Sequence, residues 1–161
     1  MKPRHAVLVT LLASAVARVA SSAGLLDSPP PPFPGGAPGV VVYRMGPVYY
    51  DPGSIDTVVR CTNTGSFSVA VAVEVFDATD RLVATATSAE VAPGAEVAFA
   101  TSADAARPGA VVPSGLASVA HGKARVSATA KTLSCIGLQV LHKADGTVRE
   151  MQLELVKKVA F

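Results

Sequence analysis

The sequence contains no tryptophan, and its 161 residues include only three tyrosines and five phenylalanines. Few side chains are therefore available to form the aromatic platforms on which sugars and nucleic-acid bases stack. Half of the residues are hydrophobic, and alanine and valine dominate among them. We expect one domain whose core consists mainly of small and β-branched side chains.

Short motifs of common catalytic and metal-binding sites are absent as well. The sequence has no GxSxG nucleophile elbow, no HExxH zinc motif, no glycine-rich phosphate loop and no acidic calcium loop. We therefore expect a protein that is not an enzyme and that holds neither a metal nor a cofactor. His121 and His142 lie in predicted turns, where a solvated side chain is expected. The enzyme alternative needs a pocket on residues 102–122 that unites His121 with Asp104 and Arg107.

The first 23 residues have the pattern of a signal peptide. A basic start at residues 1–5 precedes an apolar run of 12 residues, 6–17, and small residues at 21–23 provide a cleavage site. The alternative is a retained membrane anchor, for which the run is short and is interrupted by Arg18. The expected location is secreted or periplasmic, with no membrane span after cleavage.

Signal removal also changes the charge balance. Residues 1–23 hold three basic residues and no acidic one, so the remainder has 11 Lys and Arg against 12 Asp and Glu. Such a chain lacks the strongly basic face that nucleic-acid binding requires. Residues 24–38 follow, with consecutive prolines at 29–32, and predict an extended polyproline spacer. The alternative role of this stretch is a ligand for an aromatic groove. The folded domain is expected at residues 39–161.

Period-2 alternation predicts β-strands through most of this domain. Residues 57–88 contain three strand patterns, with Val69, Val71, Val73 and Val75 on one face, and the short turns at 63–66 and 77–80 favour an antiparallel meander. Further strands are predicted at 40–44, 97–101, 123–140 with a bulge near Thr132, and in a hairpin of 136–141 with 147–156. Residues 45–54 are predicted as a loop with Tyr49 and Tyr50 at its tip. Residues 102–122 are predicted as irregular, with a short helix at 103–106 or a strand at 116–120.

These patterns predict an all-β fold: a single antiparallel β-sandwich of about seven or eight strands. Cys61 and Cys135 both lie on predicted strands, 74 residues apart. In an exported chain such a pair most simply forms one disulfide. The alternatives are a redox pair or a metal site, but there is no CxxC spacing and no histidine lies near either cysteine.

Three segments resemble secreted immunoglobulin-like modules of bacteria, including those related to cell-adhesion repeats. They are Val-Arg-Cys-Thr-Asn-Thr-Gly at 59–65, Val-Glu-Val-Phe-Asp at 73–77 and Val-Ala-Pro-Gly-Ala-Glu-Val-Ala-Phe at 91–99, within residues 57–101. The resemblance implies an immunoglobulin-like sandwich with an adhesive or structural binding role. Antibody-type domains differ, since they have a tryptophan packed on the bridge and a tyrosine where Leu133 stands here.

The expected function is a secreted or periplasmic, non-catalytic interaction or structural module of the cell envelope, which the resemblance relates to adhesion. One alternative is an accessory subunit that adds a strand to a surface assembly, for which an exposed hydrophobic sheet edge would be the sign. The sequence does not predict an oligomeric state.

Residues 121–161 carry seven basic and three acidic side chains, whereas residues 24–120 carry four basic and nine acidic ones. We expect a binding stripe for an anionic surface polymer or an acidic protein at Lys123, Arg125, Ser127, Thr129 and Lys131. Its alternative is an ordinary solvated face with pairs to acids such as Glu150 and Glu154.

Overall fold

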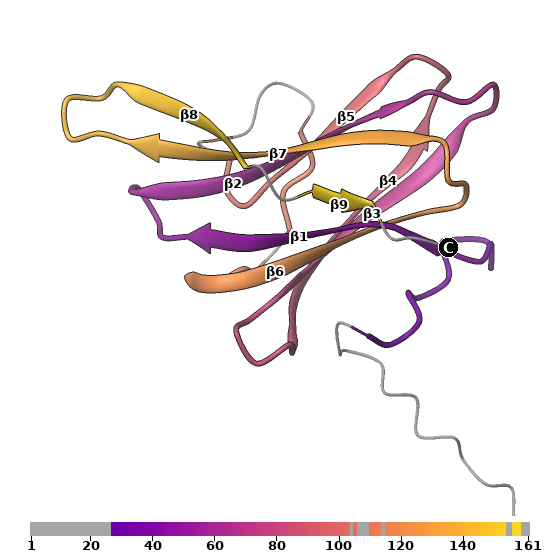
Figure 1. Cartoon of the computed structure of the whole chain (residues 1–161), viewed down its shortest axis with the longest axis horizontal. Helices are drawn as coiled ribbons and strands as arrows, with labels where there is room; N and C mark the ends of the chain where they lie inside the picture. The colour runs from indigo at the N-terminus through magenta and orange to yellow at the C-terminus, as the bar shows by residue number, and fades with distance from the viewer. Residues whose placement is uncertain (1–26, 104, 106–109, 114, 154–155, 159–161) are drawn as a thin grey trace, which may run out of the picture.

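The computed structural model describes residues 27–103, 105, 110–113, 115–153 and 156–158. These residues form nine β-strands and no helix, which confirms the predicted all-β fold (Figure 1). The strands are β1 (Val40–Tyr50), β2 (Ile55–Asn63), β3 (Val69–Phe76), β4 (Leu82–Val91), β5 (Glu96–Ala100), β6 (Val119–Ala128), β7 (Leu133–His142), β8 (Val148–Leu153) and β9 (Val156–Lys158). The helix predicted at 103–106 falls partly on residues outside the described set.

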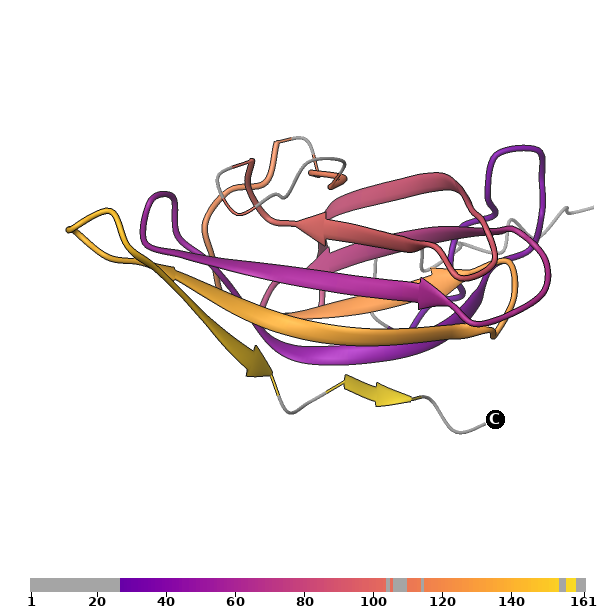
Figure 2. The same cartoon turned by 90° about the horizontal axis from the view of Figure 1, so that it is seen from above.

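The strands form two antiparallel sheets that pack face to face as a sandwich. One sheet has five strands in the order β4-β3-β6-β1-β9, and the other has four in the order β5-β2-β7-β8. Figure 2 shows β4 and β5 along one side of the molecule and β8 and β9, in yellow, along the opposite side. Each side therefore presents one edge strand from each sheet.

Valine and alanine side chains fill the space between the sheets, as the composition predicts. Val71 and Val73 of β3, Val42 of β1 and Val126 of β6 are buried and belong to one hydrophobic cluster. β-Branched side chains suit the pleated surface of a sheet and lose little freedom there. Each fully buried valine contributes roughly 1.5 to 3 kcal/mol relative to an exposed one. The core therefore needs no large aromatic cluster.

The predicted meander of residues 57–88 is wrong in its first connection. β3 and β4 do form a hairpin, but β2 pairs with β5 and β7 and lies in the other sheet. The turn at residues 63–66 therefore carries the chain from one sheet to the other. A short turn containing Asn and Gly can connect two strands of one sheet or two strands of different sheets. The turn residues alone therefore do not distinguish a hairpin from a crossover.

Asn63 holds three connections together at this end of the sandwich. Its side chain is fully buried, and Nδ2 donates to the carbonyls of Phe67, 2.7 Å away, and Val91, 2.9 Å away. Its Oδ1 accepts from the Gly65 amide at 2.9 Å and from the Thr132 hydroxyl at 3.1 Å. One amide group thus links the β2–β3, β4–β5 and β6–β7 connections.

We expect Asn63→Ala to lower the free energy of unfolding by about 2 kcal/mol or more, because the buried groups that it now pairs would lose their partners. Urea denaturation measures this loss. Thr64→Ala is the matched control, since the exposed Thr64 hydroxyl makes a single 3.1 Å bond to the Thr132 carbonyl. Equal losses from the two substitutions would contradict the role assigned to Asn63.

Two other predicted boundaries also need correction. The bulge expected near Thr132 is a complete break, because β6 ends at Ala128 and β7 begins at Leu133 in the other sheet. The loop predicted at 45–54 is strand as far as Tyr50, since β1 keeps pairing with β6 through register shifts on both sides of Val48. Pro47 lies within the first of these irregular steps, where its missing amide hydrogen costs no regular ladder bond.

The predicted hairpin at the C-terminal end is present, with β7 and β8 joined through Lys143 to Thr147. Its second arm was predicted to reach Val156, but β8 ends at Leu153, and Val156 begins β9 in the other sheet. Asp145 of the β7–β8 turn and Asp77 of the β3–β4 turn each accept hydrogen bonds from the amide and the hydroxyl of the threonine two residues later. Asp77 Oδ1 accepts from the Thr79 hydroxyl and from the amides of Thr79 and Arg81. The Thr79 hydroxyl bond and then the Arg81 amide bond hold the pKa of Asp77 below its usual value of 3.8.

A depressed folded-state pKa means that Asp77 contributes stability above its unfolded pKa and loses this contribution as the pH falls through its folded pKa. We therefore expect Asp77→Ala to destabilise the protein at neutral pH, and the difference from the native chain to narrow below about 3.8. Thermal unfolding of both proteins across this range tests it. If the stability difference between Asp77→Ala and the native chain did not change with pH, the ionised carboxylate would not be the source of the stabilisation.

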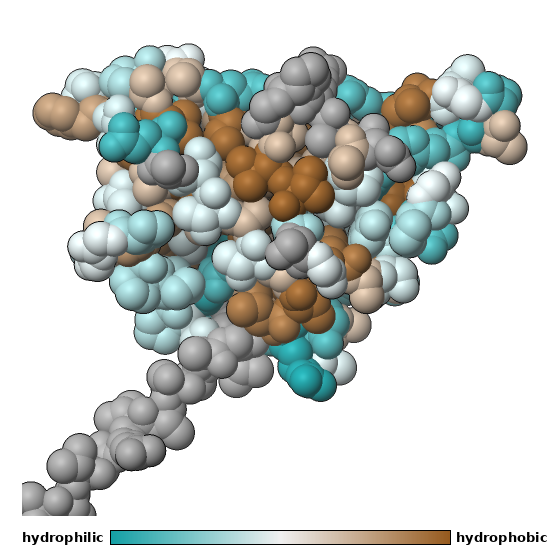
Figure 3. Space-filling view, turned by 180° about the vertical axis from the view of Figure 1, so that it is seen from behind, coloured by the Kyte–Doolittle hydropathy of each residue, from teal (hydrophilic) through white to brown (hydrophobic). Residues whose placement is uncertain are grey.

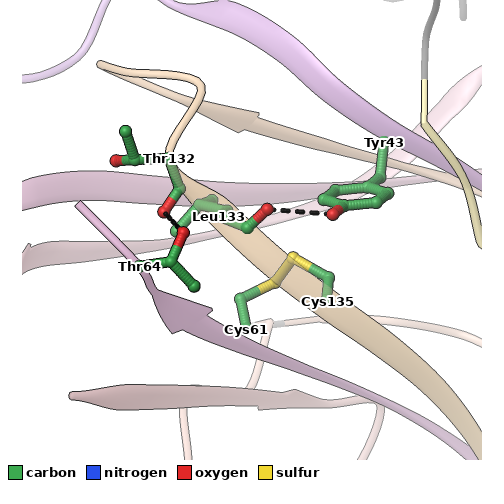
Figure 4. The surroundings of a disulfide bond; sticks show 6 residues. All are labelled: Tyr43, Cys61, Thr64, Thr132, Leu133 and Cys135. Atoms are coloured by element: carbon green, nitrogen blue, oxygen red, sulfur yellow. Dashed lines mark hydrogen bonds between the residues drawn. A yellow bond between two sulfur atoms is a disulfide. The ribbon is translucent and has the colours of Figure 1, made fainter. Parts of the chain in front are cut away.

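The expected disulfide joins Cys61 and Cys135, which lie directly opposite each other on β2 and β7 (Figure 4). Both cysteines face the core. The bridge thus links neighbouring strands of one sheet, whereas the bridge of antibody domains joins the two sheets. A contact between the sheets comes instead from Tyr43 of β1, whose hydroxyl donates to the Leu133 carbonyl at 2.9 Å.

Part of the predicted linker is packed against the domain. Ser28 and Phe33 are both buried, while the prolines between them remain largely exposed. The Gly36 amide donates to the Phe33 carbonyl at 2.9 Å, and the Phe33 amide to the Ala37 carbonyl at 2.9 Å. This turn passes through Gly35 and Gly36, both at positive φ. It folds residues 28–33, here named the N-terminal strap, back over the domain.

Candidate interaction surfaces

The predicted basic stripe is not one exposed surface. Arg125 and Ser127 are each only 1% exposed. Lys123 is about half exposed and pairs with Asp80, with 2.6 Å between Nζ and Oδ1. The Thr129 hydroxyl accepts from the Ala70 amide at 3.1 Å, and exposed Lys131 lies in the turn after β6. The five side chains do not share an open face.

Arg125 is held in a buried ion pair on the outer face of the five-stranded sheet. Its Nε and Nη2 donate to the two carboxylate oxygens of Glu74, each over 2.8 Å. The guanidinium carbon lies 5.2 Å from the centre of the Phe76 ring, and Nη1 donates to the Ser28 carbonyl. The strap therefore contributes a hydrogen-bond acceptor to the pair. A guanidinium engaged in this way is not accessible to a polymer in solution.

The period-2 pattern places Arg125 on the outer face correctly, but it carries no information about what covers that face. The strap supplies the cover, and Asp27 extends it with a 2.6 Å pair to Arg44 of β1. A serine followed by four prolines gives no signal in the sequence that its carbonyl would meet a buried arginine. This part of the surface was therefore beyond prediction.

A second polar cluster lies at the end of the sandwich where β2 begins and β5 and β7 end. Asp56 is 1% exposed. Its Oδ1 accepts from the Thr101 hydroxyl at 2.8 Å, and its Oδ2 lies 2.8 Å from His142 Nε2. The Thr101 hydroxyl oxygen also accepts from the Thr57 amide at 3.0 Å. His142 is thus a partner of a buried carboxylate rather than the solvated turn residue that we expected.

The geometry of this cluster does not resemble a nucleophile with its base. Thr101 and His142 both bond to Asp56 and not to each other, whereas base activation requires the hydroxyl to bond to the imidazole. The arrangement instead ties the ends of β2, β5 and β7 together. His121 makes a separate exposed contact, with Nδ1 2.8 Å from the Tyr49 hydroxyl. Asp104 and Arg107, the other members of the predicted pocket, lie outside the described residues.

An apolar cavity lies between the sheets near this end, lined by residues that include Val48, Val75, Phe99 and Pro113. Its volume of about 20 Å³ leaves room for little more than one water molecule. Among the described residues, no group of three or more His, Cys, Asp or Glu side chains could hold a metal ion. The described part of the chain also has no helix long and apolar enough to cross a membrane.

Sheet edges are the remaining candidates, and three of the four are protected. The 110–113 segment covers the β5 edge, where the Val111 amide donates to the Ala98 carbonyl and the Ala100 amide to the Val111 carbonyl. β8 has six residues, of which Arg149 and Glu150 are charged while Val148 and Met151 are 56% and 39% exposed, and β9 has only three residues. Short edges, charges and covering segments are the usual means of preventing sheets from pairing edge to edge.

β4 lacks this protection. It has ten residues, and Glu90 is the only charged one. No described residue pairs with its outer edge. Leu82 and Val83 at its start are 38% and 40% exposed. Figure 3 views the molecule from this side and shows hydrophobic surface there.

The register identifies which backbone groups of β4 face outward. Thr129, the residue that follows β6, donates its amide hydrogen to the carbonyl of Ala70 in β3. Backbone groups point to alternate sides along a strand, so the other even-numbered residues of β3 also direct their amides and carbonyls toward β6. Odd-numbered ones face β4, where Val73 and Val75 lie opposite Ala86 and Ala84. The amides and carbonyls of Thr85 and Thr87 therefore point away from the sheet. Their side chains are exposed as well.

The chain was compared with family models, with curated proteins and with solved structures, and none of the three comparisons found a match.

Proposed function

We propose that this chain is a non-catalytic, extracytoplasmic interaction module that binds a partner by adding a strand to the β4 edge. The observation that carries the proposal is the long, uncharged and unpaired stretch of β4 from Leu82 to Ala89. Strand addition uses main-chain hydrogen bonds for affinity and neighbouring side chains for specificity. The outward backbone groups of Thr85 and Thr87 offer the main-chain hydrogen bonds. The exposed side chains of Leu82 and Val83 offer the contacts for specificity.

The other features agree with this role. The buried disulfide fits a protein exposed to an oxidising compartment, in keeping with the expected secreted or periplasmic location. The Asp56 cluster lacks a paired nucleophile and base among the described residues. Burial of Arg125 removes the middle of the basic stripe, so we favour a strand of a partner protein over an anionic polymer as the ligand.

Site-specific photo-crosslinking in cells that export the protein tests this function. A photoreactive side chain at Thr85 is expected to give a defined adduct, and Thr87→Pro should abolish it, because proline removes an outward amide hydrogen without removing a bond to β3. Thermal unfolding of this variant should change little.

Gln152→Pro is the matched control. The Lys143 amide donates to the Thr147 carbonyl, and by the register of β7 with β8 the Gln152 amide also faces away from its sheet. The control proline therefore alters the β8 edge in the same way and should leave the adduct intact. An adduct lost equally in both variants, or retained in Thr87→Pro, would refute strand addition at β4.

A further inference from the structure

We infer that the strand added to β4 is β4 of a second copy of this chain, so that two five-stranded sheets join into one continuous sheet across a two-fold axis. This inference rests on the proposed function and specifies its partner. In a two-fold interface the same strand serves as donor and acceptor, and its sequence must be complementary to itself. The sequence of β4, Leu-Val-Ala-Thr-Ala-Thr-Ser-Ala-Glu-Val, meets this requirement.

An axis through Ala86 gives a consistent pairing. Thr85 of one copy then lies opposite Thr87 of the other, and these outward-facing residues exchange both of their backbone hydrogen bonds. Threonines opposite each other across strands are a favourable pair. Ala86 meets its own counterpart at a position without hydrogen bonds, where the backbones approach most closely and a small side chain fits.

Charge is compatible with this pairing. Glu90 is the only charged residue of β4, and the axis at Ala86 places it opposite Leu82 of the second copy. It therefore never faces another Glu90. Exposed Arg81 directly precedes Leu82. Glu90 of each copy therefore lies near Arg81 of the other copy. Like charges opposite each other would oppose association, and this register contains none.

Apolar surface surrounds the same edge. Leu82, Val83 and Val112 are each 38% to 40% exposed. Val112 belongs to the segment that pairs with β5, the edge strand of the other sheet on this side of the molecule. Two copies joined at β4 bring these side chains toward the interface, where burial of apolar surface adds to the main-chain bonds.

Sedimentation velocity of the full chain, over a hundredfold range of concentration, is the first test. We expect a reversible monomer–dimer equilibrium. Thr87→Lys places two lysines diagonally across the axis, each opposite Thr85 of the other copy, and should raise the dissociation constant about tenfold, because like charges at this spacing repel each other. Gln152→Lys on β8 should leave it unchanged. If Thr87→Lys also changes thermal unfolding, Thr87→Pro provides the second variant.

Oxidative crosslinking tests the register. A mixture of Thr85→Cys and Thr87→Cys chains should form a disulfide-linked dimer, since the two positions face each other. Thr85→Cys chains alone should form no such dimer. Position 85 of one copy lies opposite position 87 of the other, so the two introduced cysteines are two residues apart along the strands. Equal crosslinking in both samples would overturn the axis at Ala86.

The two proposals fail in different ways. A chain that stays monomeric, while the photoreactive group at Thr85 gives an adduct with another protein that Thr87→Pro abolishes, would overturn the second copy and leave strand addition standing. A dimer that tolerates both Thr87→Lys and Thr87→Pro would overturn this interface. Absence of both dimer and adduct would overturn the inference and the proposed function together.

Discussion

Replacing Arg125 with methionine is expected to lower the free energy of unfolding by about 3 to 5 kcal/mol, because the carboxylate of Glu74 would be left buried without its partner. Both side chains of the pair are at most 3% exposed, so water cannot take over the role of the guanidinium. Urea denaturation at neutral pH measures the loss.

The double variant Arg125→Met with Glu74→Met separates charge pairing from packing. Removal of both charges eliminates the unpaired carboxylate, and buried ion pairs replaced by apolar side chains often lose little stability. We expect the double variant to recover most of the stability that the single one loses. A double variant as unstable as Arg125→Met would show that the side-chain stem, and not the charge pairing, accounts for the effect.

The second large effect concerns the disulfide. Replacing Cys61 and Cys135 together with alanine should lower the free energy of unfolding by about 4 kcal/mol, the value that chain entropy gives for a loop of 74 residues. Chemical denaturation of the variant, and of the native chain kept reduced, should give similar values. Far-ultraviolet circular dichroism below the transition should still report β structure in both.

A stability unchanged by the double replacement would contradict this prediction. A control with Cys61→Ala alone leaves one free thiol and tests whether loss of the bridge, rather than loss of a sulfur atom from the core, causes the effect. Its unfolding free energy should resemble that of the double variant, because either substitution opens the loop.

The alternating valines of β3 and the Asp-Gly turn after β7 were sufficient to predict an all-β fold, the β3–β4 and β7–β8 hairpins and a core of small residues. Each of these features depends on contacts that are local in sequence or on period 2 alone. The disulfide was predictable for a similar reason, since two cysteines on strand patterns allow only one pairing.

Features that depend on distant segments were not predictable. The turn at Asn63 and the break at residues 129–132 satisfy the local rules of a hairpin and a bulge, and only the pairing of β2 with β5 and β7 reveals them as crossings between sheets. The stripe around Arg125 was misjudged because alternation places a side chain on a face without showing whether another segment covers it. The unprotected β4 edge emerged only after strand order identified which strands lie at the edges.

The placement of the disulfide has a mechanical consequence. β1 and β9 pair antiparallel, with Tyr43 opposite Lys158 and Met45 opposite Val156, so the first and last strands leave the domain at the same end. Tension applied between the two ends would open this ladder one pair at a time, as in a zipper, rather than shearing it as a whole. Extension would then stop at Cys61 and Cys135, which are 74 positions apart in the sequence, and the stretch between them, which contains β3, β4, β5 and β6, would carry no load.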